Sequence, residues 1–189
     1  MGTFVALYSV LAFLVPVVVV GAIVYLIFRR RNGQGGITAY HALIAYFYAV
    51  TAASIFIGAV GLAYLLNVAF AEFYDGVELL GNTTTGFALL AIGALLLLLH
   101  WWGRKVMEDR HDTGTRTVKR VYLFSMLALS SISGLVSMPL ALVTGARYSL
   151  GDRYYVDTPN TYLAVALVVV LVWSYYFWRV AKELRADRS

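Results

Sequence analysis

The sequence predicts an all-α integral membrane protein of five transmembrane helices, and three observations carry this prediction. The chain has 189 residues, of which 61% are apolar and only 13% charged, about half the charged fraction of a typical soluble domain. A chain this short cannot bury so many apolar side chains in a globular core, because small domains expose a large share of their surface. The apolar residues also gather in five continuous stretches, each at least as long as the roughly 18–20 residues that cross a bilayer as a helix.

The five stretches follow one another with polar segments between them. They favour helices over the strands of a barrel, because they are continuously apolar and lack strict alternation. We expect the first to be retained as a span, since no basic residue precedes it and three arginines follow. The second is long enough to reach roughly 50 Å as a helix, so we expect it to project beyond the membrane. The stretches run from about Phe4 to Phe28, Ile37 to Phe70, Thr85 to Trp102, Val118 to Gly145 and Thr161 to Trp178.

The basic residues predict the orientation of the chain. With five spans, thirteen of the fifteen lysines and arginines fall on one side, and only Arg147 and Arg153 fall on the other. Because the basic side of a membrane protein is the cytoplasmic one, we expect the N-terminus outside and the C-terminus inside a plasma (inner) membrane. The same asymmetry accounts for the net charge of +5 without a nucleic-acid partner.

An internal repeat is predicted, because the second and third stretches resemble the fourth and fifth. The third leaves the membrane as Trp-Trp-Gly-Arg-Lys-Val-Met-Glu (101–108) and the fifth as Tyr-Phe-Trp-Arg-Val-Ala-Lys-Glu (176–183). Two hairpins inserted in the same direction form a parallel repeat, which we expect to build a four-helix bundle. The predicted domains are residues 1–32 (the N-terminal helix and its basic loop), 33–112 (first hairpin) and 113–189 (second hairpin).

The exit sequence carries a resemblance to a known kind of family. His100, Trp101, Trp102 and Arg104 form a His-Trp-Trp-x-Arg motif, from which the second copy departs with Tyr175, Tyr176, Phe177 and Arg179. This pattern resembles a bacterial multi-pass membrane domain family of unknown function that is built from hairpins with a His-Trp-type exit. The resemblance covers about residues 37 to 186. It implies a four-helix unit in a bacterial membrane and implies no activity.

Two histidines are the candidate cofactor-binding residues. No Asp, Glu, Lys or Arg lies near the middle of any predicted span, although ion and proton transporters usually place an ionisable group there. His41 and His100 lie about one turn inside their spans from the same side of the membrane, and neutral imidazoles can ligate the iron of haem b or the magnesium of a chlorophyll. The alternative is that both belong to the interfacial belt of His, Trp and Tyr that anchors helices at headgroup level.

Small residues predict where helices pack closely. Ser54, Gly58 and Gly61 lie along the second stretch, and Ser130 and Gly134 along the fourth. Small residues four positions apart let two helix backbones approach each other in a membrane. Packing inside this chain, between the equivalent helices of the repeat, and packing against another subunit both remain open.

The expected function is that of a non-catalytic accessory subunit. A short chain with small-residue faces and no catalytic motif is suited to pack beside other membrane proteins, in a bacterial membrane complex such as a respiratory or photosynthetic assembly. Its expected partners are the lipid bilayer and other membrane protein subunits, without a required cofactor. Two alternatives stay open: an electron-transfer subunit that binds haem b or a chlorophyll through His41 and His100, and a small transporter or channel.

Overall fold

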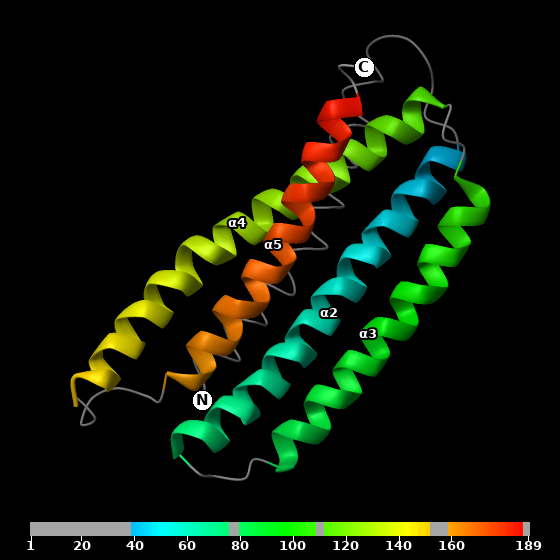
Figure 1. The fold of residues 1–189 in the computed structure, drawn as a ribbon. Coiled ribbons are helices and arrows are strands. Elements are labelled where there is room, and N and C mark those ends of the chain that lie inside the picture. Colours follow the sequence, from blue (N-terminus) through cyan, green and yellow to red (C-terminus); the bar gives the residue numbers. More distant parts are fainter. Residues whose placement is uncertain (1–38, 76–79, 109–111, 152–158, 187–189) are drawn as a thin grey trace. The chain divides into compact units, whose positions relative to one another are not determined.

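The computed structural model describes residues 39–75, 80–108, 112–151 and 159–186, and within them the chain forms four helices. The bounds are Ala39–Asp75 for α2, Leu80–Met107 for α3, Thr113–Ser149 for α4 and Asn160–Ala186 for α5 (Figure 1). All four are long and apolar enough to cross a membrane. The all-helical, multi-pass prediction is therefore supported for this part of the chain. The predicted first helix, from about Phe4 to Phe28, lies outside the described residues.

The helices extend beyond the apolar stretches at almost every end. An apolar stretch ends at the first polar residues, but the helix continues because each added residue forms a further backbone hydrogen bond. The long second stretch is one uninterrupted 37-residue helix, which corresponds to about 55 Å. The four helices have 37, 28, 37 and 27 residues in chain order. This alternation of long and short is what a repeated hairpin would give, and the repeat itself stays a prediction.

The chain divides into two compact units, each described here by itself. Unit 1 consists of the described residues up to Phe56 and those from Gly93 to Met126. In it, α2 and α3 are antiparallel neighbours, and the absence of a side chain at Gly103 leaves room for the ring of Phe47. α4 also contacts α2, since the rings of Tyr48 and Tyr122 lie 4.7 Å apart between centroids.

Unit 2 consists of the described residues from Ile57 to Ile92 and from Leu127 onward, and it contains segments of all four helices. α4 and α5 run antiparallel (Figure 1). They are neighbours, since the indole Nε1 of Trp173 donates a hydrogen bond to Ser131 Oγ at 3.0 Å. α2 is tied to the start of α5, where the Thr161 hydroxyl donates to Asn67 Oδ1 at 2.9 Å.

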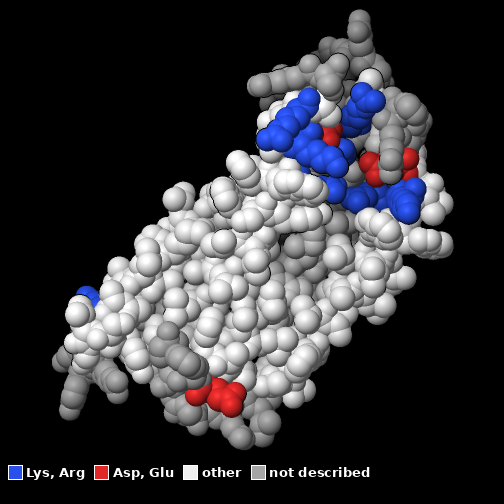
Figure 2. Space-filling model, in the orientation of Figure 1, with Lys and Arg blue, Asp and Glu red and all other residues white. Residues whose placement is uncertain are grey.

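In the part of the chain that the structure describes, charged side chains lie at or near helix ends. Figure 2 shows an uncharged surface along the length of the helices, with lysine and arginine gathered in patches. α4 begins with Arg116, Lys119 and Arg120 and carries its next basic residue only in its last turn, at Arg147. This distribution is the one expected of helices whose middle segments contact lipid.

Candidate functional site

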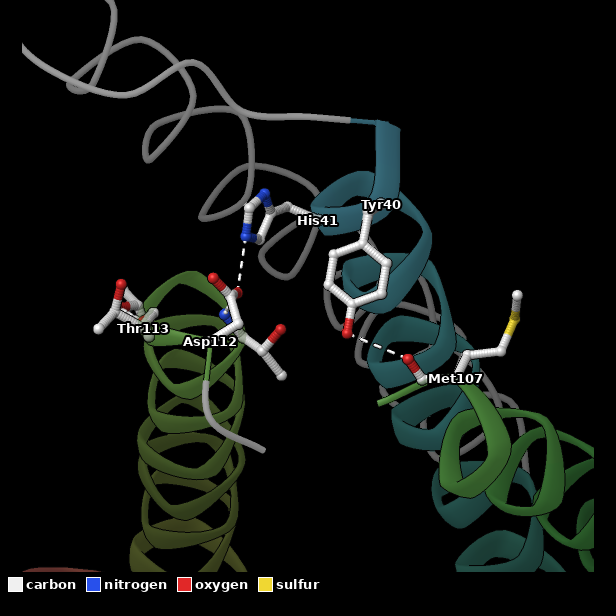
Figure 3. Close-up of polar contacts among 7 residues, drawn as sticks. Tyr40, His41, Met107, Asp112 and Thr113 are labelled. Atoms are coloured by element: carbon white, nitrogen blue, oxygen red, sulfur yellow. Dashed lines mark hydrogen bonds and ion pairs between the residues drawn. The ribbon is translucent and has the colours of Figure 1, made fainter. Parts of the chain in front are cut away.

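The main polar site lies in unit 1, where the start of α2 meets Asp112 at the start of α4 and Met107 at the end of α3. His41 stands in the first turn of α2, and its Nε2 lies 2.8 Å from Oδ2 of Asp112. Figure 3 shows the imidazole pointing from α2 toward the start of α4. An ionised carboxylate only accepts hydrogen bonds, so Nε2 carries the proton in this contact.

Asp112 is the N-cap of α4. The same Oδ2 accepts a hydrogen bond of 2.7 Å from the backbone N–H of Thr115, three residues on. This contact satisfies one of the four backbone donors that a helix leaves unpaired at its start. Two hydrogen bonds lower the pKa of Asp112 from 3.8 to about 2. The larger effect comes from the bond donated by the Thr115 N–H, and the next largest from the bond to His41. The carboxylate is therefore charged at any physiological pH.

Gly114 makes room for the imidazole. A Cβ at this position would lie 2.6 Å from His41 Cδ2 and 3.1 Å from Asp112 Oδ2, and it would collide with His41 Nε2. Only glycine lets the ring approach the first turn of α4 this closely.

Tyr40, the neighbour of His41, reaches a different helix. Its hydroxyl donates a 3.0 Å hydrogen bond to the carbonyl oxygen of Met107, the last residue of α3 (Figure 3). The last carbonyls of a helix have no partner within the helix, so this bond satisfies one of them. Two consecutive residues of α2 thus hold the end of α3 and the start of α4.

A second polar cluster lies further along α2. The hydroxyl of Tyr48 donates to Glu108 Oε1 at 3.0 Å, and Arg104 Nε lies 3.6 Å from Glu108 Oε2. The Arg104 guanidinium also covers the Tyr48 ring, 4.6 Å from its centroid. Most of the surface of both charged side chains is withdrawn from solvent. Buried charges require such partners, and here the partners join α2 to the end of α3.

His100 is surrounded by aromatic rings of α2. Its Nδ1 lies 2.8 Å from the carbonyl oxygen of Leu96, one turn earlier in α3. Because a carbonyl only accepts, Nδ1 carries the proton, and a neutral ring then keeps its lone pair on Nε2. The rings of Tyr46 and Phe47 lie 5.9 and 6.1 Å away between centroids.

The two candidate cofactor ligands therefore have different surroundings. His41 uses Nε2 to hold Asp112, whereas His100 uses Nδ1 to hold its own helix. Among the described residues, no three His, Cys, Asp or Glu side chains gather as a metal site would require. Haem b or chlorophyll binding by His41 and His100 stays a prediction.

Four of the five predicted packing residues are buried or face another helix, and Gly58 is the exception. Ser54 and Ser130 are buried, and each hydroxyl bonds to a carbonyl of its own helix. Gly61 faces α3. Gly134 faces α5, where a Cβ added to it would lie 3.6 Å from Val169 Cγ1, and Gly58 has open space beside it.

Gly61 lies in close contact with the backbone of α3. A Cβ there would lie 2.6 Å from the backbone nitrogen of Leu90 and 2.8 Å from the carbonyl oxygen of Gly86. At Gly86, in turn, a Cβ would lie 3.1 Å from the carbonyl oxygen of Gly61. Two glycines thus bring α2 and α3 into backbone contact in unit 2.

Five residues of these contacts were not predicted from the sequence: Asp112, Gly114, Tyr48, Glu108 and Gly86. A signal existed for Asp112, since an Asp followed by Thr-Gly-Thr just before an apolar run is typical of a helix N-cap. No comparable signal marks the bond between Tyr48 and Glu108, because the two residues are 60 positions apart in the chain. Such pairs depend on how the helices pack.

Comparisons with known proteins place the chain in a family. A search of curated proteins and a search of solved structures found no match. A model of the family described as "Domain of unknown function (DUF5671)" matches residues 45–175. That description mentions neither hairpins nor a His-Trp exit, so the resemblance over residues 37 to 186 stays a prediction. The match covers more than two thirds of the 189 residues, and the chain therefore belongs to the DUF5671 family.

Proposed function

We propose that this chain is a non-catalytic, integral membrane accessory subunit that packs against other membrane proteins in a larger bacterial complex. A respiratory or photosynthetic assembly would suit such a subunit. The observation that carries the proposal is the outward face of α3.

α3 presents small side chains away from its own chain. Thr84, Ala88 and Ala91 are exposed, and their spacing of four and three residues puts them on one face of a helix. A smaller share of the apolar window is buried in α3 than in the other three helices. Small residues let a second helix approach closely, and this close packing drives helix association in lipid. The face therefore suits a helix of a partner.

The polar contacts of unit 1 support a structural role. His41 and Asp112 hold the start of α4, and Tyr48 and Glu108 hold the end of α3. Each of these side chains is engaged with another helix or with a helix terminus. A non-catalytic subunit needs such ties to present its outer faces in a fixed arrangement.

The proposal includes the topology expected from the sequence. One N-terminal helix would precede two repeated hairpins, so that the chain crosses the membrane five times. The N-terminus would lie outside and the C-terminus in the cytoplasm, as the basic asymmetry favours. The long-short alternation of the four helices supports the repeat.

A second candidate function rests on His100. A histidine whose Nδ1–H is fixed by a carbonyl has the arrangement found in metal-ligating imidazoles, where Nε2 binds the metal. His100 would then be a single axial ligand of haem b or of a chlorophyll-type pigment. The test is the absorption spectrum of the purified protein, with a reduced-minus-oxidised difference. Loss of the band in His100→Ala and its retention in His41→Ala would support this candidate, and a colourless wild-type protein would refute it.

The main proposal is tested by gentle detergent extraction and identification of the proteins that come with the chain in fixed stoichiometry. We expect the double variant Ala88→Leu/Ala91→Leu to lose them, because the larger side chains fill the space that a partner helix would occupy. The matched control is Ala128→Leu, which enlarges an exposed alanine of α4. A wild-type chain that is extracted without other subunits, or equal losses in the variant and the control, would contradict the proposal.

A further inference from the structure

We propose that the C-terminal turns of α3 and of α5 each bind an anionic glycerophospholipid, with a lysine at the headgroup phosphate and aromatic rings beneath it. The two segments are named here the α3 exit, Leu98–Lys105, and the α5 exit, Leu171–Lys182. The inference does not depend on any protein partner.

The α3 exit changes along one face from apolar to aromatic to cationic. Leu98, Trp101 and Lys105 are all exposed, and their spacing of three and four residues aligns them on the helix surface. The ammonium of Lys105 lies 5.2 Å from the centroid of the Trp101 ring. At this distance the ring attracts the cation and helps to hold it above the apolar segment.

The α5 exit has the same order of side chains. Leu171, Tyr175 and Trp178 are exposed, and Lys182 follows four residues after the tryptophan. The Lys182 ammonium lies 5.6 Å from the Trp178 ring, and the Arg179 guanidinium lies 5.8 Å from the Tyr175 ring. The arrangement thus occurs independently in unit 1 and in unit 2.

The local charge suits an anion. Near the α3 exit the two described carboxylates are engaged, Glu108 with Tyr48 and Asp112 with the cap of α4. Five basic and two acidic residues lie between Arg104 and Arg120 in the described part of unit 1. The described end of α5 carries three basic residues and one acidic residue, Glu183. A net positive charge of this kind attracts the headgroups of anionic lipids.

The apolar continuation selects a lipid over a soluble anion. Leu98 is 62% exposed and Leu171 is 53% exposed, so each lysine and its aromatic ring stand directly above an open hydrocarbon surface. Tryptophan and tyrosine prefer this boundary between acyl chains and headgroups. A phospholipid has the same succession of acyl chain, glycerol and phosphate, whereas a free phosphate would leave the leucines and rings unused.

The tryptophans provide the readout. All four tryptophans of the chain lie in α3 or α5, so their fluorescence reports on these two exits. The full chain is reconstituted in phosphatidylcholine vesicles that contain a minor fraction of phosphatidylglycerol. In one sample the phosphatidylglycerol is brominated on its acyl chains, and in the other an equal mole fraction of the phosphatidylcholine is brominated instead. We expect the brominated phosphatidylglycerol to quench the tryptophan fluorescence more strongly. The expected local enrichment is about fivefold, which corresponds to the ~1 kcal/mol that each basic side chain contributes at a membrane surface.

Variants separate a defined site from general attraction. Lys105→Gln combined with Lys182→Gln should reduce quenching by brominated phosphatidylglycerol to the level of brominated phosphatidylcholine. The control is Arg147→Gln, which removes a basic residue from the last turn of α4 and should leave the difference between the two lipids intact. Equal quenching by the two lipids in the wild-type chain would overturn the proposal. An unchanged difference in the lysine variant would also overturn it, as would removal of the difference by inorganic phosphate at the same concentration as the lipid.

Discussion

At the residue scale, one carboxylate holds the first turn of α2 against the first turn of α4. Asp112 Oδ2 accepts both the Thr115 N–H and the His41 Nε2–H. Each contact fixes the position of the oxygen for the other, so the cap and the contact between helices depend on one atom. Gly114 is the third member of this arrangement, because it supplies the space in which the imidazole lies.

The role of Gly114 predicts a destabilising Gly114→Ala substitution. The new methyl group would displace the His41 ring, and the hydrogen bond to Asp112 would be lost at about 1–2 kcal/mol. The control is Gly145→Ala, also in α4, where a Cβ meets no atom within 4 Å. There the higher helix propensity of alanine should stabilise the chain by roughly 0.5–1 kcal/mol. The measurement is the SDS midpoint of unfolding in mixed micelles. Midpoints that shift in the same direction for both variants would refute the role of Gly114 in making room for His41.

Asp112 also predicts a pH dependence. Its folded-state pKa of about 2 lies below the ordinary value of 3.8. Such a carboxylate stabilises the fold above its ordinary pKa, and the stabilisation is lost as the pH falls through the folded value. Asparagine is an equally good N-cap, so Asp112→Asn removes mainly the charge. We expect the variant to be less stable than the wild type above about pH 5.

The stability difference between these two proteins should shrink as the pH falls from the ordinary pKa of Asp112 toward the folded one. It is measured as the difference in free energy of unfolding, in the same detergent at each pH. A difference that stays constant across this interval would show that the charge of Asp112 is not the source of the stabilisation.

At the element scale, α2 and α3 are held by different chemistry in the two units. In unit 1 the contact uses polar and aromatic groups, with Tyr48 bonded to Glu108. In unit 2 it uses glycine, with Gly61 against the backbone of Gly86. Backbone contact of this kind gains dispersion energy and needs no polar partner, which suits a segment surrounded by lipid.

The glycine contact predicts that Gly61→Ala is costly. Its Cβ would meet backbone atoms of α3 that cannot rotate away, so α2 and α3 must separate, at roughly 1–3 kcal/mol. Gly58→Ala is the matched control, one turn earlier in the same helix, where a Cβ meets no atom within 4 Å. The readout is again the SDS midpoint. Equal midpoints for the two variants would mean that the glycines do not set the distance between these helices.

The helices themselves were predictable, because apolar length alone identifies spans. The apolar pattern predicts an end at about Trp102 for the third span, whereas α3 continues to Met107. The predicted and observed ends differ because Arg104 and Lys105 are charged and so end the apolar stretch. In the last turn of a helix, however, basic residues are favourable, because they interact with the negative end of the helix dipole. Capping interactions determine where a helix ends, and they cannot be read from hydropathy alone.

The site was predictable only as a pair of residues. An ionisable group in an apolar stretch is conspicuous, so His41 and His100 could be singled out. Their partners could not, because Asp112 is 71 positions from His41 in the chain, and which loop meets which helix is settled by packing. The same reason explains Gly61, whose small size was visible in the sequence while its contact with α3 was not.

At the scale of the whole molecule, the distribution of charge connects the fold to the membrane. Each described helix has an uncharged middle segment, and the described basic residues lie near a helix end (Figure 2). The energetic cost of a charge in the bilayer accounts for this pattern. The excess of basic residues on one side then predicts which way the chain is inserted.

This orientation can be tested directly, because the chain contains no cysteine. A single cysteine at Leu150, which is 86% exposed just after α4, should react with a membrane-impermeant maleimide in intact cells. A single cysteine at Ala186, the last residue of α5, should react only after the cells are permeabilised, since α5 lies between the two positions. Lys105→Cys, at the end of α3, should behave like the cysteine at position 186.

The physical reason for this orientation is that thirteen of the fifteen basic residues would otherwise have to cross the membrane, against the preference that retains them in the cytoplasm. Labelling of position 150 only after permeabilisation would reverse the orientation, and labelling of positions 150 and 186 from the same side would show that α5 does not cross the bilayer.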